Sequence, residues 1–169
     1  GEAYVTGVEL ALAYKPAPDW TLFANATYTY GQDETADAPL RFIPPFNGVF
    51  GIRYESPSGR WWVEATEVWA ARFTRHAPDD EQDAGFSRDP ALGSPNTTTN
   101  KPLRDNYDIP GFWITNVRAG WKVWDDGRHG LDITLDLNNV FNTSYREVYS
   151  QRQKEAPGFG AVLGARLTF

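Results

Sequence analysis

The strongest constraint on the fold is an alternation of apolar and polar side chains with a period of two residues. Leu131, Ile133, Leu135 and Leu137 alternate with polar neighbours, and six other stretches show the same pattern. Successive side chains of a strand point to opposite faces, so each stretch predicts a strand with one apolar and one polar face. The seven predicted strands are Tyr4–Tyr14, Trp20–Tyr30, Phe46–Tyr54, Trp61–Phe73, Trp113–Val123, Leu131–Leu137 and Phe159–Phe169.

The connections between these strands alternate in length. Residues 16–19, 56–60 and 125–130 are short and rich in Pro, Gly, Ser and Asp, as tight turns are. Residues 31–45, 74–110 and 141–157 are long and polar. Short turns at one end and long loops at the other are typical of an antiparallel up-and-down transmembrane β-barrel, so this all-β architecture is our prediction.

Aromatic side chains recur eight residues apart on the apolar face, as in Trp20 and Tyr28 or Trp61 and Trp69. Eight residues extend about 26 Å along a strand, or about 20 Å along the membrane normal at a tilt of about 40°. This is close to the apolar band between the two aromatic girdles of such barrels. The residues assigned to the membrane interfaces are Trp20, Tyr54, Trp61, Trp113 and Trp121.

Composition limits the alternatives. The 169 residues suit one domain, the net charge of −6 argues against a nucleic-acid partner, and the absence of Cys excludes disulfides and thiolate metal sites. No apolar run of about 18 residues exists, so no transmembrane helix is expected. The chain starts at Gly1 without an initiator Met, which suggests a processed chain or a piece of a longer one.

Two other folds explain part of the pattern. A soluble lipocalin-like binding barrel accounts for the alternation, but not for the two aromatic rows or the charged face that includes Arg53, Arg118, Asp136 and Arg166. A small complete outer-membrane barrel with a structural or adhesive role needs an even strand number, hence an eighth strand within 74–110. That segment contains poor strand formers, so seven strands indicate part of a larger barrel.

One residue breaks the apolar face. Glu67 stands among Trp61, Val63, Ala65 and Trp69 in the fourth predicted strand. A β-bulge at Glu67 would return the apolar side chains to one face, and we therefore expect one there.

Catalytic and metal-binding patterns are weak. His76 and His129 lie in a loop and a turn, and no Ser stands in a nucleophile-elbow context. The acidic run Asp79–Asp83 lacks the ordered spacing and the Gly of a calcium loop. We therefore predict no enzymatic activity, no metal site and no cofactor.

The C-terminal third carries motifs that resemble a known family. Ile109-Pro110-Gly111-Phe112 opens a strand, Asn139-Val140-Phe141-Asn142-Thr143-Ser144-Tyr145 follows the next, and Pro157-Gly158 precedes the last, which ends at Phe169. This arrangement resembles the end of the β-barrel of a TonB-dependent outer-membrane receptor. The resemblance is specific over 108–169 and looser before it.

The resemblance implies a barrel of 22 strands closed by a plug, located in the bacterial outer membrane. Residues 1–169 would be the C-terminal part of that barrel domain, about seven strands, without the plug. The implied function is energy-coupled uptake of a scarce, bulky ligand, most commonly an iron-siderophore and otherwise haem, cobalamin or a glycan. The implied partners are outer-membrane lipid, the remaining barrel and plug, TonB through the missing N-terminal part, and the barrel-assembly machinery. Because both edge strands would be unpaired, residues 1–169 are not expected to fold unaided.

Two sets of site residues follow. The terminal strand resembles the signal read by the barrel-assembly machinery at Gly164, Leu167 and Phe169, although Val162 stands where a polar residue is usual. On the long-loop side, Arg offers a forked set of donors and Tyr a flat amphipathic ring, which suits an anionic or catecholate-like ligand. Loop arginines equally suit lipid phosphates. The predicted ligand anchors are Arg72, Arg75, Arg104, Tyr107 and Tyr149.

Overall fold

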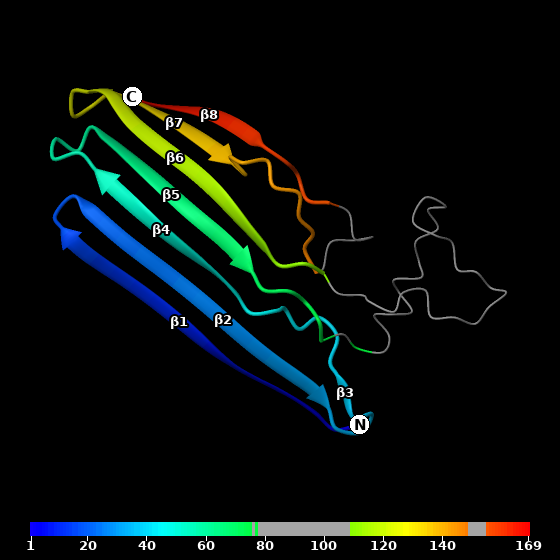
Figure 1. The fold of residues 1–169 in the computed structure, drawn as a ribbon. Coiled ribbons are helices and arrows are strands. Elements are labelled where there is room, and N and C mark those ends of the chain that lie inside the picture. Colours follow the sequence, from blue (N-terminus) through cyan, green and yellow to red (C-terminus); the bar gives the residue numbers. More distant parts are fainter. Residues whose placement is uncertain (76, 78–108, 149–154) are drawn as a thin grey trace.

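The described residues form one antiparallel sheet (Figure 1). The computed structural model describes residues 1–75, 77, 109–148 and 155–169. The strands are β1 (Ala3–Ala17), β2 (Trp20–Asp33), β3 (Ala38–Pro39), β4 (Asn47–Glu55), β5 (Trp61–Ala70), β6 (Phe112–Asp125), β7 (Gly130–Asn138) and β8 (Gly160–Thr168). Across these residues, no helix is long and apolar enough to cross a bilayer.

The long strands follow one another in the sheet in the order β1-β2-β4-β5-β6-β7-β8, and the two-residue β3 pairs with β2. Figure 1 shows the short turns β1–β2, β4–β5 and β6–β7 together at one end of the sheet, and the longer connections at the other end. The seven predicted strands, the meander order and the alternation of turn lengths are therefore confirmed.

The expected bulge at Glu67 is wrong. β5 pairs Glu67 with Phe50 of β4 and with Thr115 of β6 in unbroken register. Glu67 remains on the apolar face because the Thr115 hydroxyl beside it donates a hydrogen bond to its carboxylate. The irregularities lie next to short turns instead, between Tyr14 and Ala17 and between Lys122 and Trp124.

The sheet separates its side chains into an apolar and a polar face. Trp121 is 57% exposed and Leu163 75% exposed, and Leu135 lies on the same face. Asp136 and Arg166 alternate with them and lie on the opposite face. The large apolar side chains of the strands are thus not gathered into an enclosed core.

Buried apolar side chains gather near the long-loop end instead. Phe73 and Ile109 are each 5% exposed, and their backbones form two hydrogen bonds of 2.9 and 3.1 Å with each other. Ile114 of β6 is also buried. The fourth predicted strand extended to Phe73, whereas β5 ends at Ala70, because Phe73 pairs with Ile109 in a separate bridge.

The short strand β3 was not predicted. Asp33 accepts hydrogen bonds from the backbone N–H groups of Thr35 and Ala36, both at 2.9 Å, and Asp37 has a φ of 47°. This turn brings Ala38 and Pro39 back beside β2. Two residues are too few to give a recognisable alternation.

Gly48 of β4 allows β2 and β4 to approach closely beneath an aromatic ring. A Cβ atom at Gly48 would collide with the carbonyl oxygen of Asn25 and would lie 2.9 Å from Cζ2 of Trp69. Neither the backbone of β2 nor the indole has room to move away without breaking the ladder.

We predict that Gly48→Val lowers the free energy of unfolding of the complete protein by about 1–3 kcal/mol, because overpacking forces neighbours apart. Urea unfolding followed by tryptophan fluorescence in detergent measures it. Ala165→Val, on the open apolar face of β8, adds the same kind of volume and is expected to change little. Equal effects of the two variants would contradict this role of Gly48.

Candidate functional site

Two rows of aromatic rings cross the apolar face. Near the long loops, the ring centroids of Tyr28 and Phe46 are 6.5 Å apart, those of Phe46 and Trp69 4.8 Å, and those of Trp69 and Trp113 5.7 Å. Near the short turns, Trp20 lies 4.8 Å from Tyr54, which lies 5.2 Å from Trp61. Trp121 is the register partner of Trp61 and extends this second row. The rows predicted from the spacing therefore exist as contacting rings; their place at the membrane interfaces remains a proposal.

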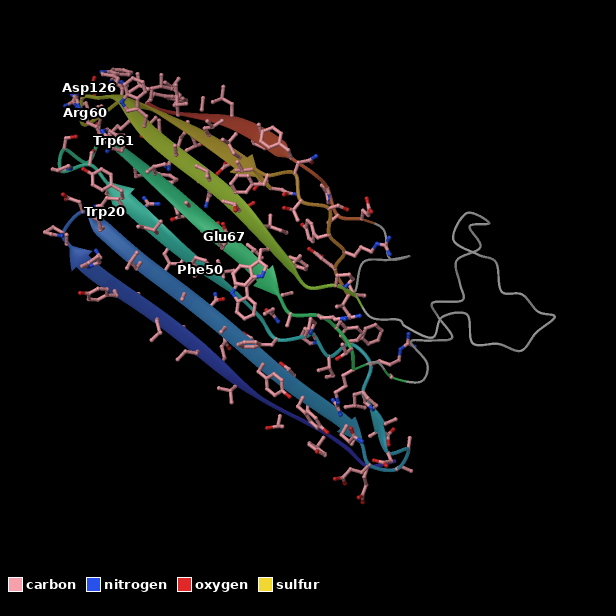
Figure 2. The ribbon with its side chains drawn as sticks, in the orientation of Figure 1. Trp20, Phe50, Arg60, Trp61, Glu67 and Asp126 are labelled. Carbon is pink, nitrogen blue, oxygen red and sulfur yellow. The ribbon has the colours of Figure 1, made fainter. Side chains whose placement is uncertain are left out.

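A polar pair lies between the two rows. Figure 2 shows Glu67 and Phe50 away from the short-turn end, where Trp20 and Trp61 lie. Thr115 donates to the Glu67 carboxylate, and the rings of Phe50 and Trp113 make an edge contact at 6.1 Å from the strands on either side of β5. The hydrogen bond and the neighbouring rings reduce the cost of a carboxylate on an apolar face.

A row of alternating charges crosses the polar face. Arg53, Glu64, Arg118 and Asp136 are successive register partners on β4, β5, β6 and β7. Arg53 lies 3.4 Å from Glu64, and Arg118 lies 2.5 Å from Asp136. Arg53 also contacts Glu55 at 2.8 Å, and its guanidinium lies 4.0 Å from the ring centroid of Trp62. These side chains neutralise one another across four strands.

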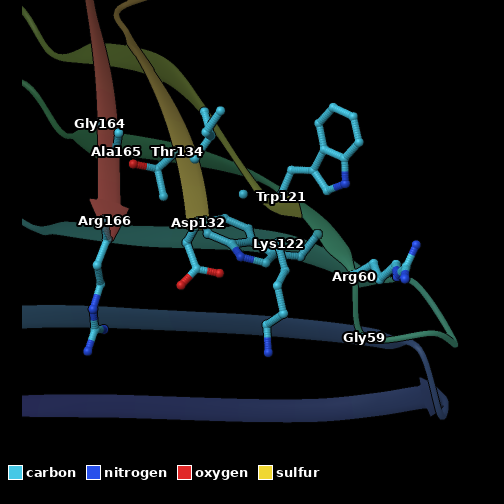
Figure 3. Close-up of a pocket in the computed structure, with 12 residues that line it drawn as sticks. Gly59, Arg60, Trp121, Lys122, Asp132, Thr134, Gly164, Ala165 and Arg166 are labelled. Atoms are coloured by element: carbon cyan, nitrogen blue, oxygen red, sulfur yellow. The ribbon is translucent and has the colours of Figure 1, made fainter. Parts of the chain in front are cut away.

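A hollow of about 460 Å³ lies on the polar face, near the short turns. Figure 3 shows Lys122, Asp132 and Arg166 pointing away from the side on which Trp121 lies. These three are neighbours on β6, β7 and β8. The next level of the wall is flatter, because Gly120 and Gly164 have no side chains and Trp62 lies over Gly120.

The motif after β7 closes the connection to β8. Asn139 is 3% exposed and has a φ of 50°. Its side-chain amide donates to the carbonyl oxygens of Thr143 at 2.8 Å and of Pro157 at 3.4 Å, and its Oδ1 accepts from the Thr143 N–H at 2.8 Å. Asn116 accepts from the Asn139 N–H at 2.9 Å. Asn139 therefore joins β6, the loop after β7 and the segment before β8.

Asn142 and Tyr145 complete this motif. Asn142 has a φ of 53°, and its Oδ1 accepts from the N–H of Phe159 at 2.9 Å, in the space that a Cβ of residue 158 would otherwise occupy. Tyr145 packs against Phe112 with ring centroids 4.6 Å apart. Burial, and then the nearby charge of Glu147, raises the pKa of the Tyr145 phenol. Asn142, Gly158 and Tyr145 thus have structural roles.

The β6–β7 turn is organised by Asp126. Its carboxylate accepts from the N–H groups of Arg128 at 2.9 Å and His129 at 2.7 Å, and these bonds lower the pKa of Asp126. The His129 ring stacks on Trp124 and lies 3.3 Å from the same carboxylate. His129 is therefore a turn residue, as predicted, and no group of three or more His, Cys, Asp or Glu suited to a metal is found in the described ranges.

The structure places only part of the predicted ligand set. Arg104, Tyr107 and Tyr149 lie outside the described residues, as do His76 and the acidic run 79–83. Arg72 directly follows β5. Arg75 donates to the carbonyl oxygen of Gly31 at 2.7 Å and to Gln32, and its guanidinium lies 3.7 Å from the Tyr30 ring centroid. Arg75 thus holds the segment after β5 against the end of β2, a contact that alternation could not reveal.

The terminal strand presents the residues of the predicted assembly signal. Leu167 is 61% exposed, Phe169 is 93% exposed, and Gly164 pairs with Thr134 on β7. Within the described part of the chain, β8 pairs with β7 alone, so its other edge is open. The geometry is compatible with pairing by a further strand, while recognition by an assembly factor stays a prediction.

We predict that Asn139→Ala loosens the β7–β8 connection. Each buried partner left unsatisfied costs about 1–3 kcal/mol, so protease cleavage within 140–158 should accelerate several-fold in the complete protein. Limited proteolysis with mass spectrometry measures this, and Asn138→Ala, at an exposed neighbouring position, is the control. Unchanged cleavage in Asn139→Ala would contradict the role assigned to Asn139.

The lowered pKa of Asp126 predicts a pH dependence. The stabilisation is fully present above the ordinary carboxyl pKa of 3.8 and is lost as pH falls through the lower folded value. Asp126→Asn should therefore reduce the difference in urea midpoint between neutral pH and about pH 2. Asp19→Asn, in the β1–β2 turn, removes the same charge as a control. The account fails if both variants reduce the difference equally.

Comparison with known proteins identifies the family. The TonB dependent receptor-like β-barrel family matches residues 1–142. No curated protein sequence matches the chain. The solved structures include the copper transporter OprC, with a TM-score of 0.71 and 19% identity over 99% of this chain and 23% of that one.

Two further structures have the same fold. The ferric-catecholate import receptor Fiu from E. coli K12 has a TM-score of 0.60 and 17% identity over 99% of this chain and 21% of that one. FpvA of P. aeruginosa, bound to a heterologous pyoverdine, has a TM-score of 0.66 and 16% identity over 99% of this chain and 20% of that one. The chain therefore spans about a fifth to a quarter of their length. Together with the two-faced meander, the family match shows that this chain belongs to the β-barrel of the TonB-dependent receptors, which are outer-membrane transport proteins of bacteria and not enzymes.

Proposed function

We propose that this chain forms part of the barrel wall and outer loops of a TonB-dependent transporter for a scarce, bulky ligand, with an iron-siderophore as the first candidate. The observation that carries this proposal is the division of the sheet into an apolar face with two aromatic rows and a polar face with a cross-strand row of charges. Such a wall separates hydrocarbon from a water-filled interior. Residues 1–169 would be its C-terminal strands.

The ligand class is supported by the named relatives. Fiu is named for ferric-catecholate import, and FpvA was solved with a ferric pyoverdine, whereas OprC is named a copper transporter. Haem, cobalamin and glycans remain the other members of the proposed class. Family membership favours the transporter over a small structural or adhesive barrel and over a soluble binding barrel.

The outer loops are the proposed ligand contacts. Arg72, Arg104, Tyr107 and Tyr149 combine forked cationic donors with flat rings, which suits an anionic or catecholate-like surface. Arg75 is the weakest of the five proposed anchors, because its donors already serve Gly31 and Gln32. The remaining barrel, a plug, TonB and the barrel-assembly machinery are the proposed partners, the last through Gly164, Leu167 and Phe169.

The aromatic rows are proposed to set the position of the wall in the membrane. Trp20, Tyr54, Trp61 and Trp121 would lie at the interface on the short-turn side. Trp113 would lie at the interface on the long-loop side. Indole and phenol rings favour this depth because one part of the ring is apolar and the other carries a hydrogen-bond donor.

An uptake experiment tests the function. A host that lacks the complete receptor should lose accumulation of one ferric siderophore from a panel labelled with radioactive iron, and the wild-type gene should restore it. Replacing Arg104 and Tyr107 together by Ala should lower the apparent affinity by about tenfold, equivalent to about 1.4 kcal/mol. Arg128→Ala, in the short turn at the opposite end, is the matched control. Normal accumulation of every ferric siderophore by the deletion host would refute iron uptake, and haem, cobalamin and glycans would then be tested in the same way.

A further inference from the structure

We infer that the hollow near the short turns is a docking site for a polypeptide segment inside the barrel, one that presents a carboxylate to Arg166 and a hydrogen-bond donor to Asp132. The segment would belong to the plug implied by the receptor family. The inference therefore rests on the proposed function. It adds a specific contact between the inner wall and what fills it.

The first argument is the unequal pairing of two neighbouring rows of charge. In the row Arg53, Glu64, Arg118 and Asp136, the ion pairs are closed within the wall. In the row Lys122, Asp132 and Arg166, Lys122 pairs with Asp125 of its own strand at 3.2 Å. Neither Asp132 nor Arg166 forms a hydrogen bond or an ion pair with any described residue, although they are register partners.

The second argument is the shape of the wall. Gly120, Thr134 and Gly164 are register partners one level further from the short turns. Thr134 Oγ1 lies 2.6 Å from where a Gly164 Cβ would stand, and Trp62 covers Gly120. Because no long side chain rises from this level, the row of Lys122, Asp132 and Arg166 forms a rim beside it (Figure 3). The resulting volume of about 460 Å³ lies within the range of protein binding pockets.

The third argument decides the kind of occupant. Arg166 offers five N–H donors in a fork that matches a carboxylate, while Asp132 offers only acceptors. A free small anion bound at Arg166 would be repelled by the adjacent Asp132, whereas a polypeptide can present an acceptor and a donor side by side. Trp62 adds an apolar surface to the same hollow. Mixed charge with an aromatic floor therefore favours a protein segment over a small anion.

A crosslinking experiment on the complete receptor tests this inference. The 169 residues contain no Cys, so a Thr134→Cys variant introduces a single thiol into this part of the wall, and it leaves Arg166 intact. A benzophenone attached to that thiol should give an intramolecular adduct with a segment that contains Asp or Glu. Leu135→Cys, on the opposite face, carries the label outward and should not give this adduct.

The charge of Arg166 is then varied in the labelled protein. Arg166→Glu should reduce the adduct several-fold, Arg166→Lys should retain part of it, and Arg128→Glu, which makes the same charge change outside the hollow, should leave it unchanged. Heat-dependent migration in gels confirms that each barrel is folded. An absent adduct, an adduct insensitive to Arg166→Glu, or one displaced by inorganic phosphate would overturn the inference. Ligand uptake by the wild type is measured separately, so failure of the proposed function is distinguishable.

Discussion

A sheet that crosses a bilayer must satisfy its backbone hydrogen bonds within the sheet, because the hydrocarbon offers no partner for N–H or C=O groups. The continuous ladder from β1 to β8 meets this requirement over the described strands. With the backbone paired, the side chains need no common core, and the two faces can serve different surroundings. Leu163 and Trp121 are exposed for this reason, and Arg118 and Asp136 pair on the other side. Only the outer edges of β1 and β8 remain open within the described part, as expected for a piece of a larger barrel wall.

Much of this fold could be predicted from the sequence, because a period of two is directly visible along each strand. Trp20 and Gly130 begin strands within one residue of their predicted positions, and the alternating turn lengths fix the meander. The error at Glu67 has a physical cause. A polar residue on an apolar face suggests a bulge only if nothing opposite can pair with it, and Thr115 lies 48 positions away in the sequence. Strand register, which brings these residues together, is not visible in a single strand.

The site was less predictable, since its contacts join segments far apart in the chain. Asn139 and Asn142 were recognised as parts of a family motif, but their positive φ angles and their bonds to Thr143 and Phe159 explain why the motif contains Asn at both places. Arg75 was selected for its exposed position in a loop, whereas it contacts Tyr30 and Gly31. The hollow beside Arg166 was not predicted, although the glycines at 120 and 164 in otherwise regular strands were a usable signal.

The central claim is that the apolar face contacts lipid and the polar face contacts water. Spin labels attached to single cysteines at each position from 131 to 137 of the complete receptor, reconstituted in bilayers, test it most directly. The account predicts that collision with oxygen, which concentrates in hydrocarbon, is high at Leu131, Ile133, Leu135 and Leu137, and that collision with a water-soluble nickel complex is high at Asp132, Thr134 and Asp136. The same accessibility at odd and even positions, or the opposite alternation, would contradict it.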